Sequence, residues 1–69
     1  MKPTYTNHAR RRMKQRRVSE SEVEMCLEDH DLLWTDRNGN PKYSKYIDGR
    51  LIKVVVKKDN PDRVITVED

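Results

Sequence analysis

Hydrophobic residues near the start of the chain recur with a helical period. Tyr5, Ala9 and Met13 are four residues apart, so on a helix they form one apolar stripe. Thr6 and Asn7 lie where this stripe begins, and both residue types cap the free N–H groups at a helix start. The spacing therefore predicts a first helix over about residues 6–16.

A second helix is expected directly afterwards. Ser19 and Glu22 have the spacing of a capping box, in which each side chain accepts a hydrogen bond from the other residue's backbone N–H. Val23, Cys26 and Leu27 then continue an apolar stripe with helical spacing. Together these signals predict a helix over about residues 20–30.

The remaining chain alternates between apolar and polar positions, which is typical of β-strands. Turn-forming residues such as Gly39, Gly49 and Pro61 divide it into segments. The expected strands cover about residues 32–36, 42–47, 50–57 and 63–67.

The third of these strands indicates how the sheet is packed. Ile52, Val54 and Val56 share one face, and we assign them to the core, whereas Lys53 and Val55 share the opposite face. One face of such a sheet packs on the helices and the other meets solvent or a ligand. The expected fold is α+β, with two N-terminal helices packed on one face of a four-stranded antiparallel sheet in a single domain of residues 1–69.

Charge is distributed unevenly along the 69 residues, although the net charge is only +3. Residues 1–18 contain seven Lys or Arg and no acid, and residues 19–31 contain six Asp or Glu and no base. A concentrated basic segment is typical of a surface that binds anions, and nucleic acid, RNA above all, is the leading candidate.

Other features narrow the class of protein. The single Cys26 excludes an internal disulfide, and the sequence has no targeting segment or apolar run that would cross a bilayer, so we expect a cytoplasmic protein without membrane contact. Cys26 and His30 have the four-residue spacing of a zinc pair, but two further ligands at suitable spacing are lacking. We therefore expect no metal site, and no phosphate-binding loop or other motif indicates a cofactor.

Several motifs together resemble a known family. They are His8-Ala9-x-x-Arg12-Met13-x-x-Arg16-x-Val18-Ser19-x-x-Glu22-Val23, then Gly49-Arg50-x-Ile52-x-Val54-Val55-Val56, and Val64-Ile65-Thr66-Val67. This pattern resembles the bacterial and phage family called domain of unknown function 4258, which is similar to the RelE and ParE toxins and to metal-independent ribonucleases such as barnase and the tRNA-cutting colicins. The resemblance implies a nucleic-acid site where the first helix meets the open face of the sheet, and a cognate antitoxin as a candidate partner. Arg17 stands where members of this family usually carry Gly.

Four residues are candidates for catalysis. His8 is of the residue type most often used for general acid–base chemistry, and Arg12, one turn later, can hold a phosphate with its planar guanidinium. Lys53 and Thr66 are candidates to line the same pocket. Each of the first two residues also has a structural interpretation: the His8 ring can fix the helix on the sheet through a backbone hydrogen bond, and Arg12 can pair with an acid of the second helix.

A second group of residues is expected to bind nucleic acid. Arg10, Arg11, Lys14 and Arg17 point away from the apolar stripe, where they either follow phosphates or form an ordinary solvated face. Tyr43 is a candidate for stacking on an unpaired base.

Other large or charged residues are expected to support the fold. Trp34 and Tyr46 are large aromatic residues like Tyr43, and at least one of them is expected in the core. Arg16 falls within the apolar stripe of the first helix and is expected to be structural, with its head on helix-end carbonyls or a Glu.

Three functions fit these observations. The first is a metal-independent endoribonuclease or toxin-like protein that uses His8, Arg12 and Lys53. The second is a non-catalytic interaction module of the same fold that binds RNA, DNA or a protein partner through the basic first helix. The third is a phage or bacterial adaptor whose acidic second helix binds a protein partner. The sequence leaves the oligomeric state open, because unpaired edge strands of the sheet are able to associate.

Overall fold

Both predicted helices are present in the computed structural model, which describes residues 2–69. Helix α1 covers Asn7–Arg16 and is capped by Thr6, whose hydroxyl accepts a hydrogen bond from the N–H of Ala9 at 3.0 Å. Helix α2 covers Glu20–Glu28 and begins with the predicted capping box between Ser19 and Glu22.

Helix α2 ends two residues earlier than predicted. The acidic residues that follow it would lie at the negative end of the helix dipole. They bind to the sheet instead: Asp31 accepts a hydrogen bond from the N–H of Tyr46 at 2.9 Å, and both Asp29 and Asp31 pair with Lys45.

The short connection between the helices depends on Arg17. This residue ends α1 in the left-handed region, with φ 54° and ψ 51°, and the N–H of Val18 donates to the carbonyl of Met13 at 2.9 Å. Glycine adopts this conformation without the steric cost that a side chain brings. The left-handed conformation of residue 17 therefore explains why glycine would suit this position.

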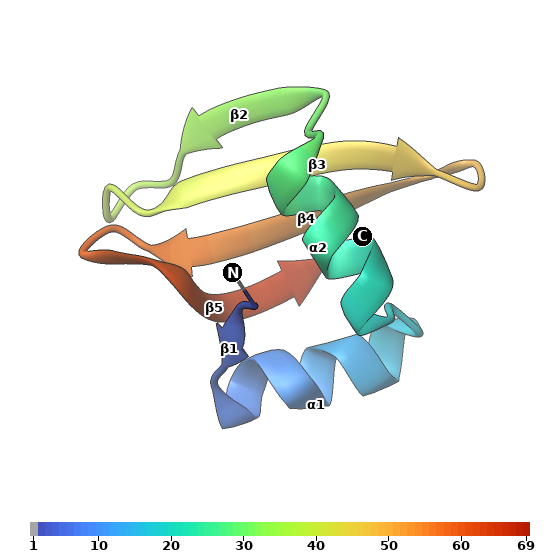
Figure 1. Cartoon of the computed structure of the whole chain (residues 1–69), viewed down its shortest axis with the longest axis horizontal. Helices are drawn as coiled ribbons and strands as arrows, with labels where there is room; N and C mark the ends of the chain where they lie inside the picture. The colour runs from blue at the N-terminus through green and yellow to red at the C-terminus, as the bar shows by residue number, and fades with distance from the viewer. Residues whose placement is uncertain (1) are drawn as a thin grey trace.

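The sheet has five strands, one more than predicted. They are β1 (Thr4–Tyr5), β2 (Leu32–Thr35), β3 (Pro41–Ile47), β4 (Arg50–Lys57) and β5 (Asn60–Glu68), in the order β1-β5-β4-β3-β2 (Figure 1). Strand β1 pairs with β5 in parallel, whereas all other pairs are antiparallel. The expected purely antiparallel, four-stranded sheet is therefore wrong. Strand β1 has only two residues and pairs with β5 near the other end of the chain, so no alternation of apolar and polar residues marks it in the sequence.

The last hairpin is also tighter than expected. Asn60 and Pro61, assigned to a turn, begin β5, and Lys57 pairs directly with Asn60. The register with β4 then shifts twice: residues 61–63 have no partner in β4 before Val56 pairs with Val64, and a β-bulge follows at Ile65 because Val55 pairs with Thr66. The extra residue, Ile65, bends β5.

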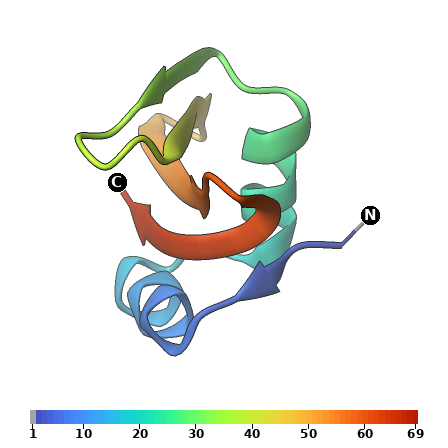
Figure 2. The ribbon, with the colours of Figure 1, turned by 90° about the vertical axis from the view of Figure 1, so that its left-hand side faces the viewer.

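The core lies between the helices and one face of the sheet. Ile52, Val54 and Val56 are fully buried, as predicted, against Val23 and Cys26 of α2 and the apolar stripe of α1. Helix α2 crosses this face of the sheet, and α1 lies along β5 and β1 at the lower edge (Figures 1 and 2). The opposite face, here called the open face, has no helix over it (Figure 2). Neither helix is long and apolar enough to cross a membrane.

Candidate nucleic-acid interface

Strand register determines which side chains share the open face. Directly paired residues of neighbouring strands point to the same side of a sheet. One row across the open face therefore contains Trp34, Lys42, Val55 and Thr66, and the next contains Leu32, Ser44, Lys53 and Glu68. Lys53 and Thr66, both predicted site residues, are thus diagonal neighbours on adjacent strands.

Two small residues form the floor of the open face. Ser44 is fully buried and Val55 is 3% exposed, although neither is covered by a helix. Within residues 2–69, the Oγ atom of Ser44 has no hydrogen-bond partner. A buried hydroxyl without a hydrogen-bond partner is unfavourable for stability. Ser44 lies directly opposite Lys53 on the neighbouring strand.

Exposed aromatic rings border this floor. Trp34 is 43% exposed and Tyr46 is 64% exposed, so the expectation that at least one of them belongs to the core is wrong. Aliphatic residues, Met13 and Cys26 fill the core. Tyr46 and the other even-numbered residues of β3 point to the open face and not to this core. Tyr43 lies on the covered face, where its ring packs edge-to-face on His30 with centroids 5.1 Å apart.

Helix α1 runs beside β5 along the edge of the open face. At its start, Thr6 donates its hydroxyl to the carbonyl of Ile65 at 2.8 Å, and at its end Arg16 Nε lies 3.7 Å from Asp69 Oδ1. Helix α1 and the segment of chain from Ile65 to Asp69 are each about 15 Å long and run in the same direction, so positions along one correspond to positions along the other. His8 and Arg12 therefore lie level with Thr66 and the residues that follow it.

The contacts of Arg10 show which way His8 and Arg12 point. The Arg10 guanidinium lies 4.3 Å from the Tyr5 ring centroid and pairs with Glu20 of α2. On the helical wheel, His8 and Arg12 occupy the opposite border of the buried stripe from Arg10, so they face away from α2. These two residues therefore lie on the side of α1 that faces away from α2, whereas Lys53 and Thr66 lie on the open face.

The structural roles considered for His8 and Arg12 are not formed in the described part of the chain. His8 is exposed and Arg12 is half-buried, and within residues 2–69 neither side chain has a hydrogen bond or an ion pair. Arg10, predicted to point outward into solvent, takes the ion pair with α2 that was considered for Arg12.

Five basic residues form all the ion pairs found among residues 2–69. These pairs involve Arg10, Arg16, Lys42, Lys45 and Arg50. Over the described residues, the cations left without an ion pair include five of the predicted site residues: Arg11, Arg12, Lys14, Arg17 and Lys53. The outer side of α1 therefore carries uncompensated positive charge next to the open face.

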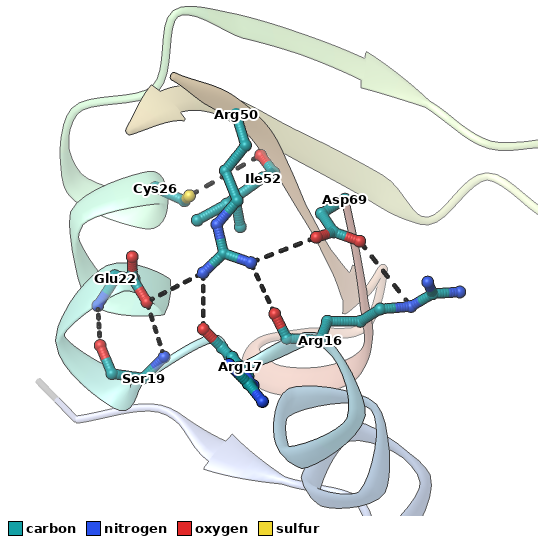
Figure 3. Close-up of polar contacts among 8 residues, drawn as sticks. All are labelled: Arg16, Arg17, Ser19, Glu22, Cys26, Arg50, Ile52 and Asp69. Atoms are coloured by element: carbon teal, nitrogen blue, oxygen red, sulfur yellow. Dashed lines mark hydrogen bonds and ion pairs between the residues drawn. The ribbon is translucent and has the colours of Figure 1, made fainter. Parts of the chain in front are cut away.

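Arg50 is the important residue that the sequence interpretation overlooked. Its guanidinium donates hydrogen bonds to the carbonyls of Arg16 and Arg17, and it also pairs with Glu22 at 3.6 Å and Asp69 at 3.2 Å (Figure 3). It therefore binds the helix-end carbonyls that were expected to bind Arg16. The only signal was its place after Gly49 in the family-like motif, and its contacts are those of a structural residue.

Cysteine and metal chemistry have little support in the described residues. Cys26 is buried and donates to the carbonyl of Ile52 at 3.8 Å, and burial raises the pKa of its thiol to about 11. His30, its considered zinc partner, packs against Tyr43. Between residues 2 and 69, no three His, Cys, Asp or Glu side chains are grouped closely enough to hold a metal ion.

A hollow of about 250 Å³ lies on the covered side of the sheet. Its lining includes Glu24, Glu28 and Asp62 beside Tyr43 and Leu27. Three carboxylates repel phosphate, so this hollow does not compete with the open face as a site for nucleic acid.

Comparison with known proteins gives one match. The model of the family described as "Domain of unknown function (DUF4258)" matches residues 5–69. The chain belongs to the DUF4258 family. This match includes both helices, the open face and every predicted site residue of this DUF4258 protein. No curated protein and no solved structure matches the chain.

Proposed function

We propose that this DUF4258 protein binds single-stranded RNA across α1 and the open face. The observation that carries the proposal is the continuity of two surfaces: the unpaired cations of α1 adjoin a sheet face with Lys53 and exposed aromatic rings. Phosphates bind to the positive charges, while unpaired bases stack on the aromatic rings.

Each part of the surface has its own role in this proposal. Arg11 and Lys14 on the outer side of α1 attract the backbone, and Arg12 and Lys53 hold a phosphate where the helix meets the sheet. Tyr46 offers a flat ring that any base can stack on.

A second candidate function is metal-independent RNA cleavage on the same surface. It is favoured by the position of His8 and Arg12 level with Thr66, and by the resemblance of the family to RelE-like toxins and barnase. His8 would remove the proton from a ribose 2′-hydroxyl, whose oxygen then attacks phosphorus. The bond to the 5′-oxygen breaks, that oxygen takes a proton from the Lys53 ammonium, and a 2′,3′-cyclic phosphate is left.

Binding is tested by fluorescence anisotropy with a labelled 12-nucleotide RNA at several salt concentrations. Replacing Arg11 or Lys14 with Ala should weaken binding and reduce the slope of log affinity against log salt by about 0.7 each. Tyr46→Ala should weaken binding by about 1 kcal/mol or more without changing this slope. Lys2→Ala removes an exposed cation that lies outside α1 and serves as the matched control. The proposal fails if Lys2→Ala has the same effect as Arg11→Ala, or if no RNA binds at low salt.

Cleavage is tested separately with the same RNA by following the cyclic phosphate product. We expect His8→Ala and Arg12→Ala to abolish product while the far-UV circular dichroism spectrum is unchanged. RNA that binds but stays intact with the wild type would reject the ribonuclease function and leave the binding function standing.

A further inference from the structure

Strand β2 is an edge strand without the usual protection against association. It has one neighbour in the sheet, β3, and all four of its residues are exposed. Leu33 on the covered side is 51% exposed, and Leu32 and Trp34 on the open face are each 43% exposed. Natural edge strands are commonly protected by a charged residue, a proline or a bulge, and residues 32–35 contain none of these.

The other edge of the sheet is different. Strand β1 has only two residues and follows directly after Pro3, which has no N–H group to offer a neighbouring strand. That edge is too short to pair extensively with another chain. The apolar, unpaired edge is therefore confined to β2.

Hydrogen bonding with β3 determines which backbone groups of β2 point outward. Asp36 donates its N–H to the carbonyl of Asn40 at 2.9 Å, which marks a hydrogen-bonded pair at the end of the ladder. Such pairs occur at every second residue, so Trp34 and Leu32 also direct their N–H and C=O groups to β3. The N–H and C=O groups of Leu33 and Thr35 therefore point away from the sheet.

We propose that β2 pairs in antiparallel orientation with β2 of a second copy of this chain. The outward groups of Leu33 and Thr35 are placed symmetrically about Trp34, so Leu33 of each copy can exchange two hydrogen bonds with Thr35 of the other. This is the register that pairs all four outward groups of the strand. It joins the two five-stranded sheets into one and places both Trp34 side chains next to each other on the same face.

Arg37 supplies a charge argument for this antiparallel arrangement. It follows Asp36 after the strand and has no ion pair within residues 2–69, whereas Asp29 and Asp31, which pair with Lys45, precede the strand. In this register Arg37 of each copy lies opposite Asp31 of the other, whereas parallel pairing would place the two Arg37 side chains near each other. A second copy therefore complements this edge in backbone groups and apolar side chains, and it gives Arg37 an acidic neighbour.

The oligomeric state tests the proposal, measured by sedimentation velocity over a range of concentrations. The wild type should reach twice its monomer mass of 8.3 kDa as concentration rises. Thr35→Pro removes an outward N–H from each copy but none that β3 uses, and Leu33→Lys adds a charge to the edge. Each variant should raise the dimer dissociation constant about tenfold or more, since two hydrogen bonds are lost or two like charges meet.

Met25→Lys is the matched control, because Met25 is also an apolar residue with 43% exposure but lies on α2. It should dimerise like the wild type. Trp34 is the only tryptophan, so its emission should shift to shorter wavelength as the dimer forms. A wild type that stays monomeric at millimolar concentration, or dimers that persist in both folded β2 variants, would overturn the proposal. Binding of an extended segment of another protein by a monomeric wild type would show that the edge serves a different partner.

Discussion

Replacing Arg50 with Ala should destabilise this protein more than replacing any of the unpaired cations of α1. The Arg50 guanidinium binds the two carbonyls that end α1, and it also contacts the capping box of α2 through Glu22 (Figure 3). A helix end leaves its last carbonyls without intrahelical partners, so the loss of these bonds affects the junction of both helices.

The structure sets the size of the effect. A hydrogen bond from a charged donor generally contributes about 1.5 to 3 kcal/mol to stability. The Arg50 side chain is 32% exposed, so in the Ala variant water can partly replace the guanidinium as the donor to these carbonyls. We take about 1 kcal/mol for each of the two carbonyl bonds and about 0.5 kcal/mol for the ion pairs. The expected loss is about 2 to 3 kcal/mol, from a total stability of about 3 to 10 kcal/mol for a chain of this length.

Urea unfolding followed by circular dichroism measures this loss. With a slope near 1 kcal/mol/M for so small a domain, the midpoint should fall by about 2 to 3 M in Arg50→Ala. Arg50→Lys keeps the charge but not the two-pronged donor geometry, so it should recover about half of the loss. Arg11→Ala is the matched control and should stay within about 0.5 kcal/mol of the wild type. If Arg50→Ala unfolds at the same urea concentration as Arg11→Ala, the structural role assigned to Arg50 is wrong.

Two further changes test other features of the fold. Arg17→Gly should raise the free energy of unfolding by about 1 kcal/mol because the left-handed conformation then carries no side-chain strain, whereas Gln15→Gly within α1 should lower it by a similar amount. Equal effects of the two variants in urea unfolding would contradict this account. Cys26 should react with a thiol reagent at pH 8 only as fast as the protein unfolds, because its thiol is buried and has a pKa of about 11. Between the ordinary thiol pKa of 9.0 and 11 the folded state holds the proton that the unfolded state has lost, so stability should fall as pH rises above 9. Rapid labelling of the folded protein would argue against a protected thiol.

Local signals predicted the helices and the longer strands well. The capping box of Ser19 and Glu22 acts within a single turn, so its residues identify the helix start without reference to the rest of the fold. Strand β4 was predicted because its alternation separates Ile52, Val54 and Val56 from Lys53. Both patterns depend only on neighbouring residues.

Features that depend on distant parts of the chain were not predicted. Strand β1 exists through its pairing with β5, and the bulge at Ile65 brings Val64 and Val67 to the same buried face despite their odd spacing. For the candidate site, Lys53 and Thr66 share a face as expected, but Tyr43 lies on the other face. Aromatic residues occupy both faces of β3, so composition alone could not decide which ring is available to a ligand.

The hydrogen-bonded ladder beneath the open face limits how RNA would be recognised there. In the interior of the sheet, the N–H and C=O groups of β3 and β4 are occupied by neighbouring strands and cannot read base edges. Discrimination among bases would fall to the partly exposed polar side chains on this face, which are Lys42, Lys53, Thr66 and Glu68. Glu68, which pairs with Lys42 at 3.7 Å, can accept from the exocyclic amino groups that adenine, cytosine and guanine carry and uracil lacks, whereas stacking and phosphate contacts accept any base. A surface built in this way would be broadly tolerant of sequence.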